Sequence, residues 1–169
     1  MNKCFWLIGL SGAGKTTLSN NVVEILEDDL IKVLDGDILR DGLNSNLSFS
    51  IKDRNENIRR VAEVSKLFLD SDFTVINSFI TPTEEMRQIA RNILGDLYVE
   101  VFIDAPLSIC ENRDVKGLYK KARSGEIKNF TGIDSVFERP LNPNIIIDTT
   151  KGLCVSVDEL LNEIKKHQL

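Results

Sequence analysis

Short apolar runs recur along the chain and predict buried strands. They occupy residues 4–8, 31–34, 74–77, 98–103 and 145–147, and they are rich in Val, Ile and Phe with little polar alternation. Strands of this kind are covered on both faces, as they are in a parallel sheet flanked by helices.

Amphipathic segments separate these runs and predict helices. The predicted helices span residues 15–26, 53–70, 84–94, 107–113, 116–124 and 158–166. Ser156 and Glu159 have capping-box spacing at the start of the last one. Strands that alternate with helices predict an α/β fold with a five-stranded parallel sheet, and ligands then bind beyond the carboxyl ends of the strands. No repeat or linker interrupts residues 1–169, so a single domain is predicted.

The segment between the first strand and the first helix has the spacing of a P-loop. It reads Gly9-Leu10-Ser11-Gly12-Ala13-Gly14-Lys15-Thr16, and Thr17 follows. Glycines allow tight turns that bring backbone N–H groups up to phosphate oxygens at a helix N-terminus. Lys15 is expected to reach the β- and γ-phosphates of ATP, and the Thr16 hydroxyl is expected to ligate Mg²⁺. An ordinary glycine-rich turn is the alternative, and the strand–helix context disfavours it.

Two carboxylates, Asp35 and Asp37, follow the second predicted strand. In phosphoryl transfer one acid helps to hold hydrated magnesium, and another orients or deprotonates the attacking hydroxyl. Because residues two apart in an extended chain share a side, both carboxylates are expected to face the P-loop. A surface Asp-Gly turn is the structural alternative.

Polar residues also open the long helix that follows Arg40 and Phe49. Ser50 and Asp53 have capping-box spacing, which places Arg54 and Asn57 in the first turns. Both continue the apolar stripe of this helix and so face inward. They are candidates for holding a ligand, and a helix-start hydrogen-bond network is the alternative.

A basic segment at about residues 114–134 is the next candidate. The segment from Arg113 to Arg123 contains five Lys and Arg residues, both ends included, in a chain of net charge −5, and Phe130 follows. This pattern predicts a lid that closes on an anionic nucleotide, with Phe130 stacked on a base at a gain of about 1–3 kcal/mol. A solvated basic helix with Phe130 in the core is the alternative.

Composition narrows the class of protein further. The acidic balance disfavours a nucleic-acid partner. Three widely spaced cysteines and a single histidine, His167, predict neither a zinc site nor a disulfide framework, and a reducing cytoplasm fits. The first apolar run is too short for a membrane span and leads into the P-loop, so neither a membrane segment nor a signal peptide is expected.

With these residues in place, the chain resembles the adenylylsulfate (APS) kinase family. The resemblance extends over nearly the whole length through the segments GLSGAGKTT, LDGD, LR.GLN, FS..DR.ENIRR, SFI.P, KGLYKKARSGEI and FTGIDS. It implies an α/β P-loop NTPase fold with helices on both faces of a five-stranded parallel sheet, usually as a homodimer. The implied reaction moves the γ-phosphate of ATP, with Mg²⁺, to the ribose 3′-hydroxyl of adenylylsulfate.

The same resemblance implies the role of each candidate residue. Asp37 would meet the 3′-hydroxyl, Asp35 and Thr16 would lie at the magnesium ion, and Lys15 would act on the transferred phosphate. The ATP side would consist of residues 9–17 and Arg113. The acceptor side would consist of Asp37, Arg40, Phe49, Arg54, Asn57, Phe79, Ile80, Thr81, Lys116, Leu118 and Phe130, with the two phenylalanines Phe49 and Phe130 sandwiching the base.

Three departures from the family pattern leave the acceptor open. Thr81 stands where the family usually has Ser, Glu84 and Glu85 replace basic or aromatic residues, and Asp41 is acidic. Added negative charge disfavours a strongly anionic ligand. Cytidine diphosphoramidate, the acceptor of related kinases in capsule biosynthesis, is therefore an alternative of equal weight. An ATP-dependent switch and a different small-molecule kinase are further alternatives, and KGLYKKARSGEI and FTGIDS disfavour the latter.

Overall fold

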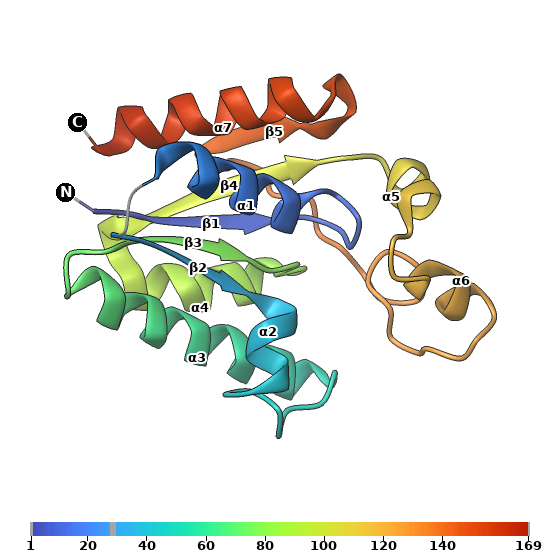
Figure 1. Ribbon diagram of the computed structural model, residues 1–169. Helices are drawn as coiled ribbons and strands as arrows, with labels where there is room; N and C mark the ends of the chain where they lie inside the picture. Colours follow the sequence, from blue (N-terminus) through green and yellow to red (C-terminus); the bar gives the residue numbers. More distant parts are fainter. Residues whose placement is uncertain (1, 28–29, 169) are drawn as a thin grey trace.

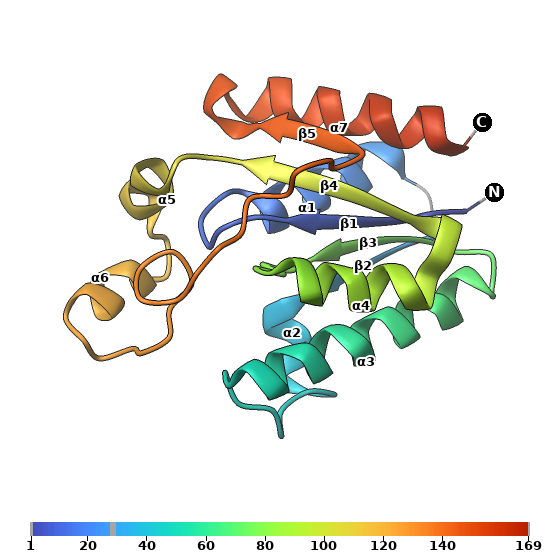
Figure 2. The ribbon, with the colours of Figure 1, turned by 180° about the vertical axis from the view of Figure 1, so that it is seen from behind.

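A parallel five-stranded sheet lies between two layers of helices in the computed structural model, which describes residues 2–27 and 30–168 (Figures 1 and 2). The strands are β1 (Cys4–Ile8), β2 (Ile31–Asp35), β3 (Thr74–Ser78), β4 (Tyr98–Asp104) and β5 (Ile145–Asp148). The α-helices are α1 (Lys15–Leu26), α2 (Gly36–Asp41), α3 (Ile51–Leu69), α4 (Glu84–Leu94), α5 (Leu107–Arg113), α6 (Leu118–Arg123) and α7 (Leu153–Gln168). Two 3₁₀ turns, η1 (Gly95–Leu97) and η2 (Thr149–Lys151), precede β4 and α7.

The strand order is β2-β3-β1-β4-β5, with every neighbouring pair parallel. Strand β1 is central, and all five of its residues are buried. Phe5 and Leu7 pack in the core under α1 and α7, while Cys4, Trp6 and Ile8 pack in the core under α3 and α4. A strand between two apolar cores reads as a continuous apolar run, which is why the sequence predicts it without alternation.

Four of the five strands continue one residue beyond their apolar runs. The added residues are polar, and they pair across the sheet as Asp35 with Ser78 and Asp104 with Asp148. Backbone pairing does not depend on side-chain polarity, so a prediction from apolar runs ends each strand early. These polar residues lie at the carboxyl edge of the sheet.

Helix α2 is absent from the sequence-based prediction. The Asp35 side chain accepts a hydrogen bond from the Asp37 backbone N–H, 2.9 Å away, and thereby caps this helix. Asp37 therefore lies in the first turn of α2. The expectation that Asp35 and Asp37 share one side of an extended chain is wrong.

Helix α7 begins at Leu153, five residues earlier than predicted, and the capping role of Ser156 is wrong. The Ser156 hydroxyl lies inside the helix and donates to the Gly152 carbonyl, 2.9 Å away. Asp148 caps the preceding η2 turn, and Gly152, at φ 102°, redirects the chain into α7. Other helix boundaries agree within about two residues, the usual scatter at helix ends.

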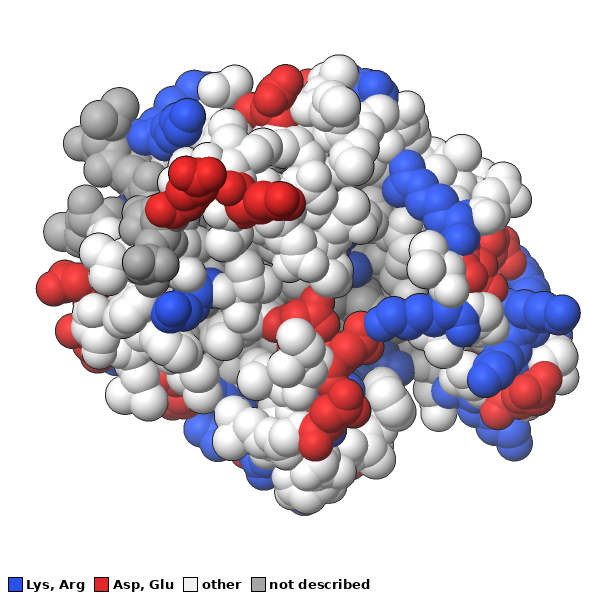
Figure 3. Space-filling model, viewed as in Figure 1, with Lys and Arg blue, Asp and Glu red and all other residues white. Residues whose placement is uncertain are grey.

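Helices α5 and α6 and the loop after them extend from the carboxyl end of the sheet, apart from the two helical layers (Figures 1 and 2). Residues 114–134, called the basic segment below, contain α6 and this loop. Lys and Arg side chains gather on the surface over α6 (Figure 3). Within the part of the chain that the structure describes, no helix is both long and apolar enough to cross a membrane.

A leucine pair tests the core under α7. Leu160 is 0% exposed, whereas Leu67 on α3 is 68% exposed. Leu160→Ala is expected to lower the free energy of unfolding by about 2–5 kcal/mol because it leaves a cavity. Leu67→Ala is expected to change it by less than about 0.5 kcal/mol. Urea denaturation followed by circular dichroism measures both, and equal losses would contradict the assigned core.

Candidate active site

A cavity of about 900 Å³ lies at the carboxyl edge of the sheet, between the P-loop, α2, α3 and the basic segment. Most of the site residues predicted from the sequence line it. They are Ser11, Gly12, Gly14, Lys15, Thr16, Thr17, Asp35, Asp37, Arg40, Phe49, Arg54, Asn57, Phe79, Ile80, Thr81, Arg113, Lys116, Leu118 and Phe130. Gly9, Leu10 and Ala13 do not line this cavity, although they belong to the P-loop. The fold thus gathers residues from across the sequence into one site.

Two P-loop glycines are required by close backbone packing. A Cβ on Gly9 would lie 2.6 Å from the Ile103 carbonyl oxygen at the end of β4. Gly12 has φ 73°, and a Cβ there would lie 2.9 Å from the Cys110 carbonyl oxygen of α5. Any side chain at either position would force the loop away from β4 or α5, so both glycines set the position of the P-loop.

Lys15 extends back inside the P-loop. Its Nζ donates to the Gly9 carbonyl at 2.9 Å and to the Leu10 carbonyl at 2.8 Å, and the residue is buried. Burial lowers the pKa of Lys15 to about 8, with Asp35 and Asp37 among the groups that oppose the shift. The ammonium is therefore held among backbone groups where a phosphate chain would lie along the loop.

Thr16 and Asp35 form an oxygen pair beside Lys15. The Thr16 hydroxyl donates to Asp35 Oδ2 at 2.7 Å, and Asp35 is buried. Magnesium prefers oxygen ligands and is commonly bound by one or two carboxylates together with substrate phosphates and water. Among the described residues, no three Asp, Glu, His or Cys side chains cluster so as to hold a metal ion by themselves. The donor set therefore suits a magnesium ion that arrives with a nucleotide.

Asp37 contacts the basic segment across the cavity. Its Oδ2 forms an ion pair with Lys116 Nζ, and both side chains are more than half exposed. Asp35 caps α2 and is buried, whereas Asp37 in the first turn of this helix carries its carboxylate at the surface of the cavity. A solvent-accessible carboxylate at this place can accept a proton from a hydroxyl group.

Arg40 and Phe49 form one wall of the cavity. The Arg40 guanidinium lies 4.3 Å from the centroid of the Phe49 ring and donates to the Leu47 and Ser48 carbonyls, each at 3.3 Å. Phe49 is 60% exposed, which leaves a ring face available for stacking. Burial, followed by the nearby Arg54, lowers the pKa of Arg40.

Arg54 connects α3 to the basic segment. Its Nη1 donates to Thr131 Oγ1 at 2.8 Å, its Nη2 to the Asn129 carbonyl at 2.6 Å, and its Nε to the Phe49 carbonyl at 3.0 Å. Burial lowers the pKa of Arg54, and Asp134 acts in the opposite direction. The guanidinium thus fixes the two aromatic walls of the cavity relative to each other.

Asn57 and Phe130 are held by neighbours that sequence reasoning missed. Asn57 Oδ1 accepts from Asn44 Nδ2 at 3.0 Å. The Phe130 ring packs edge-on against Tyr119, with centroids 5.0 Å apart, and it also packs against the core. The ring contacts the core, as the core interpretation expects, and it also lines the cavity, so that stacking on a ligand stays a prediction.

Arg113 and Thr149 hold the P-loop through its backbone carbonyls. Arg113 Nη1 donates to the Gly12 and Ala13 carbonyls, both at 3.2 Å, and Nη2 donates to the Thr149 carbonyl at 2.8 Å. Thr149 Oγ1 donates to the Ala13 carbonyl at 2.9 Å. Sequence reasoning missed Thr149, whose only signal is its place directly after the last strand. The Tyr119 hydroxyl, also missed, donates to the Ser11 carbonyl at 2.9 Å.

The acceptor loop, residues 79–83, joins β3 to α4. Phe79, Ile80 and Thr81 line the cavity. Thr81 has φ 43°, a conformation that costs a β-branched residue about 1–3 kcal/mol. Its hydroxyl is buried and accepts a hydrogen bond from Trp6 Nε1 at 2.9 Å. This placement gives the Thr81 hydroxyl a structural partner within the fold.

The acidic residues that left the acceptor open do not reach the cavity. Asp41, Glu84 and Glu85 are not among the residues that line it. Glu84 pairs with Arg87 and Arg91 on α4, and Glu85 Oε1 accepts from Asn55 Nδ2 at 2.8 Å. The expectation that these carboxylates add negative charge at the acceptor is therefore wrong, since a sequence shows nearness along the chain but not the direction of a side chain.

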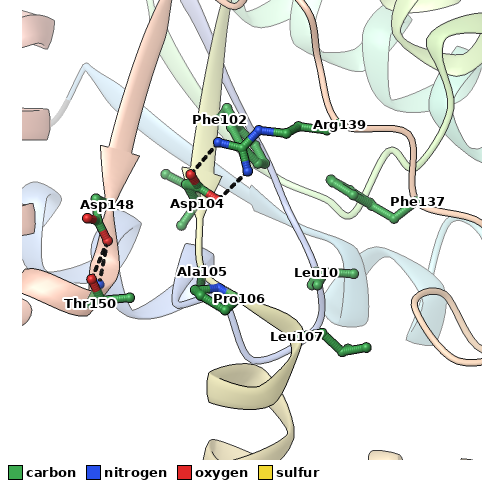
Figure 4. Close-up of a pocket in the computed structure, with 11 residues that line it drawn as sticks. Leu10, Phe102, Asp104, Ala105, Pro106, Leu107, Phe137, Arg139, Asp148 and Thr150 are labelled. Carbon is green, nitrogen blue, oxygen red and sulfur yellow. Dashed lines mark hydrogen bonds and ion pairs between the residues drawn. The ribbon is translucent and has the colours of Figure 1, made fainter.

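A second, smaller cavity of about 490 Å³ lies beside β4 and β5 (Figure 4). Leu10, which is absent from the main cavity, lines this one together with Phe102, Phe137 and the ion pair of Arg139 with Asp104. The two cavities share none of their lining residues. The P-loop therefore borders a cavity on each side, and of these two cavities only the main one is lined by Lys15 and Thr16.

The fold and the main cavity define a P-loop kinase, because the phosphate loop faces a carboxylate and an aromatic-lined space for an acceptor. The family model for adenylylsulphate kinase matches residues 1–148. The chain is 50% identical over 169 residues to an adenylyl-sulfate kinase of Clostridium acetobutylicum, an alignment that covers 97% of this chain and 84% of that protein. It is 51% identical over 166 residues to the adenylyl-sulfate kinase of Lactiplantibacillus plantarum, with 96% and 80% covered.

A solved structure agrees with these matches. The Mycobacterium tuberculosis APS kinase, in complex with AMPPNP and APS, superposes with a TM-score of 0.91 at 43% identity and covers 97% of this chain and 98% of that one. The chain belongs to the adenylylsulphate kinase family and is a phosphotransferase with a hydroxyl acceptor. The resemblance stated from its motifs is confirmed, as are the five-stranded sheet and the P-loop kinase fold.

The buried environment of Lys15 predicts an unusual titration. Its pKa in the folded protein is about 8 against an ordinary 10.5. The unfolded chain therefore holds more protons than the folded one between these values, and the contribution of Lys15 to stability rises with pH through this window. NMR titration of the Lys15 side chain is expected to give a midpoint near 8. Lys15→Met identifies the signal, and a midpoint near 10.5 would contradict the burial argument.

Proposed function

We propose that this protein is a single-domain adenylylsulfate kinase that transfers the γ-phosphate of ATP to the ribose 3′-hydroxyl of adenylylsulfate. The observation that carries the proposal is the single cavity in which Lys15, Thr16 and Asp35 face Asp37 and the Phe49–Phe130 walls. Family membership, shown by the matches above, supports the same reaction. The cytidine diphosphoramidate alternative loses its physical support, because the acidic residues that suggested it do not line the cavity.

On the donor side, the P-loop backbone and Lys15 bind the phosphates, and Arg113 keeps the loop in place. A magnesium ion bound at Thr16 and Asp35 would neutralise charge that develops on the phosphates. Asp35 has two roles in this arrangement, because one oxygen accepts from Thr16 and the other caps α2. The donor site and the position of Asp37 are thereby linked through a single carboxylate.

On the acceptor side, the base stacks between Phe49 and Phe130, and Arg40, Arg54 and Asn57 hold the ribose and the anionic tail. Stacking between aromatic rings tolerates any base, so the arginines and the acceptor loop carry more of the selectivity. Asp37 accepts the proton of the 3′-hydroxyl as the oxygen attacks the γ-phosphorus, and the bond between this phosphorus and the β,γ-bridging oxygen breaks, so that ADP leaves. The transfer is direct, since the Thr81 hydroxyl is buried and bonded to Trp6.

Residues 114–134 act as a lid in this proposal. Lys116 approaches Asp37 from the lid, and Arg54 bonds to Thr131 and Asn129 on its return side. Closure of the lid brings positive charge over two anionic substrates and excludes water that would otherwise hydrolyse ATP. Tyr119 is buried, and its hydroxyl holds the lid against the P-loop by donating to the Ser11 carbonyl at 2.9 Å.

The proposal includes a homodimer in the cytoplasm. Exposed apolar residues on the edge strand and the segment before it, Ile146, Leu141 and Val136, support an interface between two copies. The cysteines Cys4, Cys110 and Cys154 are free, which suits a reducing compartment. Light scattering measures the oligomeric state, and a monomer at micromolar concentration would overturn the dimer alone.

A direct assay tests the activity. The protein with Mg²⁺ and ATP is expected to release ADP when adenylylsulfate is added and to yield a product phosphorylated at the 3′ position. Adenylylsulfate that lacks the 3′-hydroxyl is the matched control and is expected to give no turnover. Coupled ADP detection and mass spectrometry provide the readouts. ATP hydrolysis that is independent of any acceptor, or turnover with cytidine diphosphoramidate alone, would refute the proposal.

Asp37→Asn tests the proton acceptor. The variant keeps the size of the side chain but removes its basicity, so kcat is expected to fall about 10²–10⁴-fold while the Kd for ATP stays within about twofold. Asp41→Asn is the control, because Asp41 lies one turn later on the same helix, is exposed and does not line the cavity. Equal activity of Asp37→Asn and the natural protein would exclude Asp37 as the base.

A further inference from the structure

The chain returns from the lid to the sheet through residues 136–139, called the return segment below. Its Phe137 ring stacks on Phe102 of β4 at a centroid distance of 6.2 Å. Arg139 forms a bidentate ion pair with Asp104 at the end of β4, and its guanidinium lies 4.8 Å from the Phe102 ring (Figure 4). The return segment is thus fixed to β4 on one side.

The other side of the return segment is fixed to the acceptor loop through Glu138. The Glu138 N–H donates to the Pro82 carbonyl at 2.8 Å. The Glu138 side chain accepts from the Glu84 N–H at 2.6 Å. The Glu138 carbonyl accepts from Arg87 Nη1 at 3.0 Å. One residue of the return segment therefore contacts the acceptor loop, the start of α4 and the arginine of its first turn.

Arg87 is the buried member of this contact. Arg87 is 1% exposed, and it does not line the main cavity. Its Nη1 donates to the Thr81 carbonyl at 3.4 Å as well as to Glu138, and its Nε pairs with Glu84 at 2.9 Å. A buried cation requires partners for its charge and its donors. Here those partners belong to two segments that are far apart in the sequence.

Thr81 shows why this contact bears on the acceptor. Its left-handed backbone is unfavourable for a β-branched residue and persists only where surrounding bonds hold it. Trp6 holds the side chain, and Arg87 holds the carbonyl. Loss of the bond from Arg87 is therefore expected to let the peptide after Thr81 relax and to shift the wall of the cavity formed by Ile80 and Thr81.

We propose that Arg87 is a positioning residue for the acceptor. Its side chain holds the acceptor loop and the return segment together as one unit. This inference rests on the proposed function and deepens it. Donor binding is independent of Arg87, since Lys15, Thr16 and Arg113 lie on the P-loop, α1 and α5. Loss of Arg87 therefore weakens the acceptor step and leaves the ATP step largely unchanged.

Three variants test the role of Arg87 in full-length protein. Arg87→Met is expected to raise the KM for adenylylsulfate about tenfold or more, with the KM for ATP within about twofold. Arg87→Lys, which keeps the charge but loses the planar set of donors, is expected to lie between Arg87→Met and the natural protein. Arg91→Met is the matched control, because Arg91 lies one turn later on α4 and shares the partner Glu84, but it bonds to Glu100 rather than to the Thr81 and Glu138 carbonyls.

Amide hydrogen exchange supplies a readout that does not depend on turnover. The Glu138 N–H is expected to exchange faster in Arg87→Met and Arg87→Lys than in Arg91→Met, since its acceptor is the Pro82 carbonyl of the loop that Arg87 holds. If the natural protein does not phosphorylate adenylylsulfate, the proposed function fails. The exchange rate of the Glu138 N–H then tests by itself whether Arg87 holds the acceptor loop and the return segment together. Equal rises in both KM values, equal effects of Arg87→Met and Arg91→Met, or unchanged exchange in folded Arg87→Lys would each overturn the proposal.

Discussion

The close packing of the P-loop backbone against β4 and α5 is the constraint on which the rest of the site depends. Gly9 lies against the Ile103 carbonyl and Gly12 against the Cys110 carbonyl, with no room for a side chain. Arg113 and Thr149 then bond to the loop carbonyls from the side of β5. A loop fixed in this way presents its N–H groups in one arrangement, so phosphate binding requires little reorganisation of the backbone.

The acceptor side is held together by a different kind of interaction. Its walls come from α2, α3, the acceptor loop and the basic segment, and buried or half-buried arginines connect them. Arg54 joins α3 to the basic segment, and Arg87 joins the acceptor loop to the return segment. A guanidinium has several donors in a fixed plane, so one side chain can bond to carbonyls on two segments at once. Backbone packing, together with Arg113, therefore holds the donor side, whereas arginine bridges connect the walls of the acceptor side.

Asp35 belongs to both the donor side and the acceptor side. It accepts from Thr16 on the donor side, and it caps the helix that carries Asp37 on the acceptor side. Its position follows from the parallel pairing of β2 with β3, which brings Asp35 to the carboxyl edge beside Ser78. Sheet geometry and this cap together set the distance between Asp35, the proposed magnesium ligand, and Asp37, the proposed proton acceptor.

The sequence by itself determined the fold class, the P-loop and most of the residues of the cavity. Apolar runs such as residues 4–8 are set by burial on both faces, and the P-loop is set by local spacing, so both can be read along the chain. Only the tertiary structure decided that Arg87 bonds to Glu138, that Arg54 bonds to Thr131 and that Thr149 bonds to the P-loop. The physical reason is that these features depend on the direction of side chains and on partners distant in the sequence, which a local pattern does not encode.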